Sequence, residues 1–287
     1  MHSQNLRAPL ARRRAILVLT GFVALLLGLA FWSREPAISA EKPIVQRLYW
    51  IFYKEDIERI NAFDPAMVRQ LAAGPGTYAL TRSAFGPKLP PGVLPAENFF
   101  SAASLQQAIA SGAVYPGVKF VAEDPEDWRA TPMPERLTPI PYMKKFAAAA
   151  NTHGLTPILV PARDLMRVPH AVCTQNPADT ISQAYISCGI PAAAADARFF
   201  VIQAAAVETN LPALRQLVSQ GAAEARRANP SVIVLATLSA APNGTPVPYT
   251  AVDRAAQAIL PYVKGFEMNS EPPNDHALVS FLQGLSG

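Results

Sequence analysis

A repeat of short apolar runs and longer helical stretches is the feature that most constrains the fold of this chain. Apolar, β-branched or aromatic runs alternate with alanine-rich segments that have the periodicity of a helix. A nearly continuous apolar run is typical of a strand that is buried on both faces. Such runs cover residues 77–81, 118–123, 157–160, 199–203, 232–238 and 263–269. The expected helices cover residues 101–111, 139–153, 177–190, 211–228, 249–260 and 275–285.

An additional unit is indicated ahead of this repeat. Residues 49–54 (YWIFYK) read as a strand, and residues 56–73 have a helical pattern. This unit brings the expected number of strands to seven. The alternative is a single aromatic helix that begins at Val45.

Repeated strand–helix units give parallel strands with right-handed crossovers, which form either an open doubly wound sheet or a closed barrel. The sequence contains neither GxGxxG nor GxxxxGK[ST], so a nucleotide-binding sheet has no motif to support it. We therefore expect an α/β (β/α) TIM-like barrel over residues 40–287, complete or one strand short. The Pro/Gly-rich residues 85–95 are expected to form a long irregular loop on the second strand-to-helix connection.

The N-terminal segment has the layout of an export signal. Three arginines at 12–14 precede an uncharged apolar run over residues 15–32, and small residues follow. Cleavage after Ser39 or Ala40 is expected if the segment is a signal peptide. The run also approaches the thickness of a bilayer, so an uncleaved membrane anchor is the alternative. With either interpretation, residues 1–39 are a leader and the body lies outside the cytoplasmic membrane.

Charge and cysteine content agree with this location. The net charge of +4 comes from the leader, because residues 40–287 carry 20 basic and 20 acidic side chains. A neutral body lacks the basic surface that a phosphate backbone requires, so nucleic acid is not expected as a partner. Cys173 and Cys188 are the only cysteines. An oxidising compartment would let them pair, and two buried thiols are the alternative.

Two carboxylates at predicted strand ends are the candidate catalytic groups. In such barrels the chemistry lies where the strands stop. Glu123 closes KFVAE, and Glu267 lies in GFEMN between Phe266 and Met268. If Phe266 and Met268 pack outward, Glu267 points into the barrel, where a carboxylate is costly unless it is paired or working. Two carboxylates on one rim suit glycoside hydrolysis, which is retaining at roughly 5 Å separation and inverting at roughly 6.5–9.5 Å.

Other polar residues near the strand ends are candidate substrate ligands. Asp124 and Glu126 follow Glu123, and Trp128 offers a flat face on which a sugar ring could stack. Arg163 after the fourth predicted strand, Gln203 and Asn269 complete the predicted set. The chain has no HExxH, no GxSxG and no spaced His/Cys set, so we expect no metal and no cofactor.

Three segments carry a resemblance to known proteins. KFVAEDPEDWRATPMPERLTPIPYM, LTPILVPARDLM and VKGFEMN resemble a group of secreted bacterial proteins of unassigned activity, in which a DPE-W-TP loop precedes a P-x-R-D-L segment. This likeness would cover most of residues 45–285. More distantly, the chain is similar to TIM-barrel glycoside hydrolases. It departs from their Asn-Glu pair at the fourth strand, where residues 161–164 read Pro-Ala-Arg-Asp.

Two functions follow as alternatives. The first is a glycoside hydrolase that acts on glycans outside the cytoplasm, with Glu123 and Glu267 as the acid/base and nucleophile in undetermined order. The second is a non-catalytic barrel at the cell surface that binds a saccharide or a protein.

Overall fold

Eight parallel strands close into a barrel in the computed structural model, which describes residues 42–81, 89–270 and 275–286. Each strand pairs with the next one along the chain, and the last pairs with the first, with Tyr49 opposite Gly265. The strands are β1 (Tyr49–Tyr53), β2 (Gly76–Thr81), β3 (Val93–Phe99), β4 (Phe120–Glu123), β5 (Thr156–Leu159), β6 (Phe199–Ile202), β7 (Ile233–Ser239) and β8 (Gly265–Asn269). The α/β TIM-like barrel expected from the sequence is confirmed, and it is complete.

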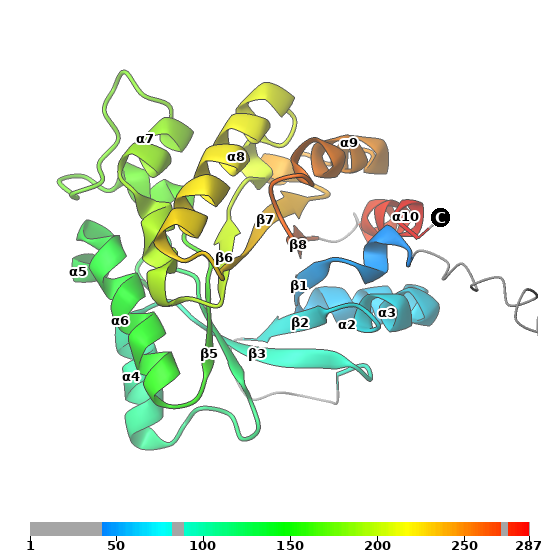
Figure 1. Ribbon diagram of the computed structural model, residues 1–287, viewed down its shortest axis with the longest axis horizontal. Helices are drawn as coiled ribbons and strands as arrows, with labels where there is room; N and C mark the ends of the chain where they lie inside the picture. Colours follow the sequence, from blue (N-terminus) through cyan, green and yellow to red (C-terminus); the bar gives the residue numbers. More distant parts are fainter. Residues whose placement is uncertain (1–41, 82–88, 271–274, 287) are drawn as a thin grey trace, which may run out of the picture. The chain divides into compact units, whose positions relative to one another are not determined.

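Helices surround the strands on the outside of the barrel (Figure 1). They are α2 (Lys54–Phe63), α3 (Pro65–Ala72), α4 (Ala102–Ser111), α5 (Met133–Leu137), α6 (Pro139–Thr152), α7 (Ile181–Ser187), α8 (Leu211–Ala228), α9 (Tyr249–Ile259) and α10 (Asp275–Gly284). Short 3-10 turns are η1 (Ile44–Gln46), η2 (Arg163–Arg167), η3 (Ile190–Asp196), η4 (Ala205–Val207) and η5 (Pro242–Gly244). Residues 49–53 form a strand, so the alternative of one long aromatic helix is wrong.

The strand that sequence reasoning missed is β3. We expected an irregular loop over residues 85–95, of which 82–88 lie outside the described residues. From Val93 onward the chain is a strand paired with β2 and β4, and no described residue between β2 and β3 is helical. Pro95, Glu97 and Asn98 hide the apolar pattern of this strand. Glu97 is tolerated there because its carboxylate accepts a hydrogen bond of 2.9 Å from the Tyr115 amide.

The expected helix over residues 177–190 is shorter than its sequence pattern. It begins at Ile181, because Thr180 and Gln183 form a capping box that fixes the first turn. Cys188 follows its last residue, and η3 continues the chain. The helical pattern over residues 56–73 is divided into α2 and α3 at Asp64, whose side chain caps α3 by accepting from the Met67 amide. Other helices end close to the expected residues; for example, α6 ends before His153, and Gly154 adopts a positive φ of 68°.

Two apolar layers hold the barrel together. Outward-facing side chains such as Trp50 and Phe266 pack beneath the helices, whereas inward-facing ones such as Ile51 and Leu235 fill the interior. A glycine closes the ring, since a Cβ at Gly265 would collide with the backbone of Tyr49 on β1. The filled interior is a packed core rather than a pore.

The predicted leader is not part of the described structure. Residues 1–39, including the apolar run at 15–32, lie outside the described residues, so signal peptide and anchor both stay predictions. In the described part of the chain, no helix has the length and apolarity needed to span a membrane.

Candidate functional site

Polar side chains replace the apolar filling where the strands reach their carboxyl ends. Side chains alternate between the two faces of a strand. Val201 and Leu235 face the interior, so Gln203 and Thr237, two positions further on, face it as well. The same two-residue alternation identifies the inward-facing side chain at the carboxyl end of the other strands. The inward-facing residues there are Tyr53, Asn98, Asp124, Gln203, Thr237 and Glu267. We call these six residues the mouth layer.

Glu267 is a mouth-layer carboxylate whose environment is strongly desolvating. Phe266 and Met268 pack outward beneath the helices, so Glu267 points inward, as the sequence indicated. Its side chain is only 2% exposed, and the Thr237 hydroxyl donates a hydrogen bond of 2.5 Å to its Oε2 atom. Burial raises the pKa of Glu267 to about 7, and the negative charge of Glu126 contributes in the same direction. Glu267 is therefore poised to hold or release a proton near neutral pH.

Asp124 is held in place by two other members of the mouth layer. The Tyr53 hydroxyl donates to its Oδ2 atom at 3.2 Å, and the Gln203 amide donates to Oδ1 at 3.3 Å. The same Gln203 nitrogen also donates to the Val160 carbonyl at 3.2 Å. Asp124 and Gln203 therefore fix the ends of β4 and β6 to each other.

A cavity of about 390 Å³ lies at this end of the barrel. Gln203 and Thr237 of the mouth layer contribute to its lining. The other polar lining residues come from the ends of β7 and β8 and from loops that follow the strands. They are Glu126, Arg163, Asp164, Arg167, Ser239, Asn243 and Asn269. Polar groups of this kind, in a concave site at the carboxyl end of a barrel, are typical of a ligand site.

The loop after β4 is fixed by its own hydrogen bonds. The Glu126 amide donates to the Thr131 hydroxyl, which donates to the Phe100 carbonyl, each at 3.1 Å. Trp128 forms a T-shaped contact with the Phe100 ring, with centroids 4.6 Å apart, and does not belong to the cavity lining. Glu126 is thus presented to the cavity by an ordered loop, whereas Trp128 is not.

Glu123 lies on the other side of the barrel wall. Val121 packs in the outer layer and Ala122 in the interior, so Glu123 faces outward beneath the helices. It is 0% exposed, and neither of its oxygens has a hydrogen-bond partner among the described residues. Burial raises the pKa of Glu123 well above its ordinary value, and the Glu135 carboxylate raises it further. The structure therefore does not bring Glu123 and Glu267 to a common opening, and a catalytic role for Glu123 stays a prediction without geometric support.

Apart from Trp128, the other sequence-predicted substrate ligands converge. Glu126, Arg163, Gln203 and Asn269 line one cavity, and Asp124 joins Gln203 in the mouth layer. Sequence reasoning missed Thr237, Asn98, Tyr53 and Arg167. Thr237 carried a usable signal, because it is a polar residue inside an otherwise apolar strand, as Glu267 is.

Some hydrogen-bonding capacity at this end is unused. Both polar atoms of the Asn98 side chain and Oδ1 of Asn269 are buried without a hydrogen-bond partner among the described residues. Buried polar groups of this kind are rare and call for a partner. Of the two residues, Asn269 lines the cavity, whereas Asn98 does not.

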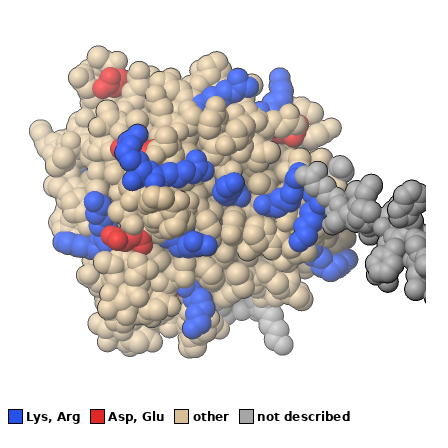
Figure 2. Space-filling view, in the orientation of Figure 1, with Lys and Arg blue, Asp and Glu red and all other residues tan. Residues whose placement is uncertain are grey.

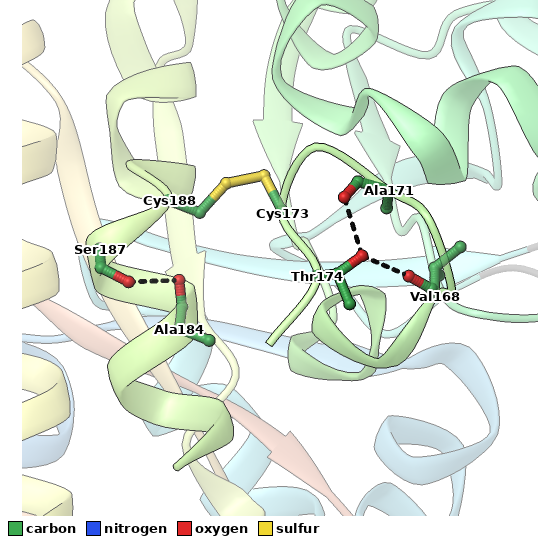
Figure 3. The surroundings of a disulfide bond; sticks show 7 residues. All are labelled: Val168, Ala171, Cys173, Thr174, Ala184, Ser187 and Cys188. Atoms are coloured by element: carbon green, nitrogen blue, oxygen red, sulfur yellow. Dashed lines mark hydrogen bonds between the residues drawn. A yellow bond between two sulfur atoms is a disulfide. The ribbon is translucent and has the colours of Figure 1, made fainter. Parts of the chain in front are cut away.

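The predicted disulfide between Cys173 and Cys188 is formed, with Cα atoms 5.4 Å apart. It ties the loop after η2 to the end of α7 (Figure 3). Arg163 is attached to the same helix, since its Nη1 atom donates to the Ser182 hydroxyl at 2.8 Å. One wall of the cavity is therefore cross-linked covalently.

No group of three or more metal-ligating His, Cys, Asp or Glu side chains occurs in the described ranges. The expectation that the protein needs no metal and no cofactor stays a prediction. Lys and Arg side chains are spread among uncharged residues over the face drawn in Figure 2. The expectation that nucleic acid is not a partner is likewise untested.

Comparisons with known proteins identify the fold. No protein-family model matches the chain, and no curated protein sequence matches it. Among solved structures, the chain is similar to a curdlan-specific GH128 (subgroup III) exo-β-1,3-glucanase from Blastomyces gilchristii in complex with glucose. The TM-score is 0.51 and the identity 12%, over 85% of this chain and 99% of that one.

Two further structures are similar at a lower level. A Bacteroides thetaiotaomicron protein provisionally assigned as an α-L-fucosidase gives a TM-score of 0.49 at 8% identity, over 88% of this chain and 95% of that one. The carboxyl transferase domain of Rhizobium etli pyruvate carboxylase gives 0.49 at 10% identity, over 84% and 43%. At such identities the likeness concerns the barrel alone, because one fold hosts many chemistries.

Proposed function

We propose that this barrel is a glycoside hydrolase in which Glu267 is the general acid and Glu126 the second carboxylate. The observation that carries the proposal is a buried carboxyl whose pKa is raised to about 7 beside a second carboxylate that lines the same end of the barrel. Glu126 takes the place that sequence reasoning gave to Glu123.

The chemistry needs one protonated and one ionised carboxyl group. The Thr237 hydroxyl donates its hydrogen bond to Oε2 of Glu267. The transferable proton would therefore be carried by Oε1. Protonation of the glycosidic oxygen by Glu267 would let the leaving sugar depart as an alcohol. Glu126 would either attack the anomeric carbon or remove a proton from the attacking water, according to its distance from Glu267.

A saccharide suits the rest of the cavity. Gln203, Ser239 and Asn269 present amides and a hydroxyl, which match the hydroxyl groups of a sugar ring. The similarity of the barrel to that of a glucanase solved with glucose is consistent with this ligand class.

The test compares three variants on a panel of polysaccharides. We expect Glu267→Gln to lower turnover by about 10²-fold or more, because it removes the transferable proton. Glu126→Gln should lower turnover to a similar extent. Glu123→Gln, which changes an equally buried carboxyl outside the mouth layer, should retain wild-type turnover.

Each alternative has its own result. Loss of turnover in Glu123→Gln but not in Glu126→Gln would restore the pair expected from the sequence. Glycan binding without turnover by the wild type would favour the non-catalytic barrel.

We also propose that the barrel works outside the cytoplasmic membrane, either released or held through residues 15–32. The leader pattern and the disulfide support this location. Fractionation of the native host, followed by N-terminal sequencing of the mature chain, tests it. A chain that begins at residue 40 or 41 indicates cleavage, an intact membrane-bound chain indicates an anchor, and an intact cytoplasmic chain contradicts the proposal.

A further inference from the structure

Two arginines lie on one wall of the cavity. Arg163 and Arg167 both belong to η2, which follows β5, and both line the cavity. Neither forms an ion pair within 4.0 Å with a described carboxylate. Among the described residues, the side chain of Arg163 has one hydrogen bond, from its Nη1 atom to the neutral Ser182 hydroxyl at 2.8 Å.

One acid lies beside the two arginines but forms no described ion pair within 4.0 Å with either. Asp164 lies between them in sequence and lines the same cavity, and its Oδ1 atom accepts a hydrogen bond of 3.1 Å from the Asp127 amide. Burial lowers the pKa of Arg163; the charge of Arg167 acts in the same direction, and the charge of Asp164 acts in the opposite direction. Two guanidinium groups are thus brought together at the edge of a polar cavity, one of them half-buried.

We propose that Arg163 and Arg167 form a subsite for an oxyanion on the substrate, so that the glycan is acidic. This inference rests on the proposed function for its place in the reaction. A guanidinium group donates in a planar fork that matches carboxylate, sulfate and phosphate oxygens. An anion there would pair with both charges and relieve their mutual repulsion.

The position of the subsite also orients the substrate. Glu126 and the arginines line the same cavity, so an acidic substituent is attracted toward η2 and repelled from the proposed catalytic carboxylates. The uncharged part of the sugar is thereby directed toward Glu126 and Thr237. A glycan without an acidic group would lack this orientation.

The first test is a binding measurement that does not depend on turnover. Calorimetry on the Glu267→Gln full chain compares an oligogalacturonide with its methyl ester, which has the same sugars without the charge. A sulfated galactan oligosaccharide and a phosphorylated mannan distinguish the three oxyanions. We expect at least one acidic glycan to bind about 10-fold more tightly than its neutral counterpart, with an affinity that falls as salt is added.

Arginine variants in the same background assign the effect. Arg167→Gln changes an exposed side chain and should lower affinity for the acidic glycan about 10-fold, with little effect on the neutral one. Arg163→Lys keeps the charge but loses the planar fork, and should lower it by a smaller factor. Arg254→Gln is the matched control, because Arg254 is exposed, lies outside the cavity lining, and donates a hydrogen bond to Thr250 of its own helix.

The outcomes separate this inference from the proposed function. Equal affinity for charged and neutral glycans, or unchanged affinity in both arginine variants, overturns the oxyanion subsite. Acidic-glycan binding that depends on the arginines, without turnover by the wild type, leaves the subsite standing and removes the hydrolase. Turnover that depends on Glu267, with equal affinity for acidic and neutral glycans, removes the subsite and leaves the hydrolase standing.

Discussion

The Thr237 hydroxyl donates a 2.5 Å hydrogen bond to Oε2 of Glu267, and both side chains point into the barrel from neighbouring strands. This hydrogen bond stabilises the ionised form of Glu267 and so lowers its pKa. Burial acts in the opposite direction and is the larger effect, so the pKa is raised to about 7. The protonation state of Glu267 therefore depends on Thr237.

Removal of this hydroxyl should move the pH profile. In Thr237→Val the ionised form of Glu267 loses a donor, so its pKa rises further and the alkaline limb of the activity profile moves to higher pH. Thr237→Ser keeps a hydroxyl and should leave the limb near its wild-type position. An alkaline limb that stays in place or moves to lower pH in Thr237→Val contradicts the assignment.

Glu267 should also make folding stability depend on pH. Its pKa is about 7 in the folded chain and 4.5 in the reference state, so the folded chain binds more protons between these values. Stability is therefore full below about pH 4.5 and falls as the pH rises to about 7. Urea unfolding at pH 5 and pH 8 should show a smaller loss for Glu267→Gln than for the wild type. An equal loss in both proteins would show that Glu267 is not the responsible group.

Loss of the disulfide should lower both the folding stability and the affinity for acidic glycans. Cys173 and Cys188 close a loop of 15 residues, for which chain entropy predicts about 3 kcal/mol. The double variant Cys173→Ser/Cys188→Ser should lose stability of this order in urea unfolding. Because Ser182 holds Arg163, the variant should also bind acidic glycans less tightly. The corresponding neutral glycan is the control, and an equal loss for both would indicate general unfolding rather than loss of the arginine wall.

Closure of the barrel should depend on Gly265. A methyl group there would meet the backbone of Tyr49, which the sheet holds in register with Gly265. Gly265→Ala should therefore destabilise the fold by several kcal/mol, on the order of other severe packing defects. Gly112→Ala is the comparison, since nothing lies within 4 Å of the added group, although its positive φ still carries some strain. Equal melting temperatures for the two variants would contradict the close approach.

The sequence predicted the direction of Glu267 but not that of Glu123, for a physical reason. Glu267 stands between two large apolar residues, Phe266 and Met268, which occupy the outer layer and set the phase of the strand. Glu123 ends a run in which both faces are buried, so the neighbouring apolar residues do not reveal its phase. For a strand that is buried on both faces, the sequence pattern reveals where the strand lies but not which way each side chain points.

β3 was missed because the surroundings of its polar residues are set by the tertiary structure. Glu97 is bound by an amide 18 residues further along the chain, and Asn98 belongs to the mouth layer. Neither the Tyr115 amide nor the mouth layer can be read from local sequence. The convergence of Arg163 with Arg167 also depends on the 3-10 turn of η2, which the sequence pattern did not indicate.

The most direct measurement is the turnover of a glycan by the wild type and by Glu267→Gln, with Glu97→Gln as the control. Glu97 is a buried carboxylate that faces away from the mouth layer and is bound by the Tyr115 amide. We expect Glu267→Gln to lose about 10²-fold or more in turnover, while Glu97→Gln turns over the glycan at nearly the wild-type rate. Wild-type turnover by Glu267→Gln would contradict the central assignment.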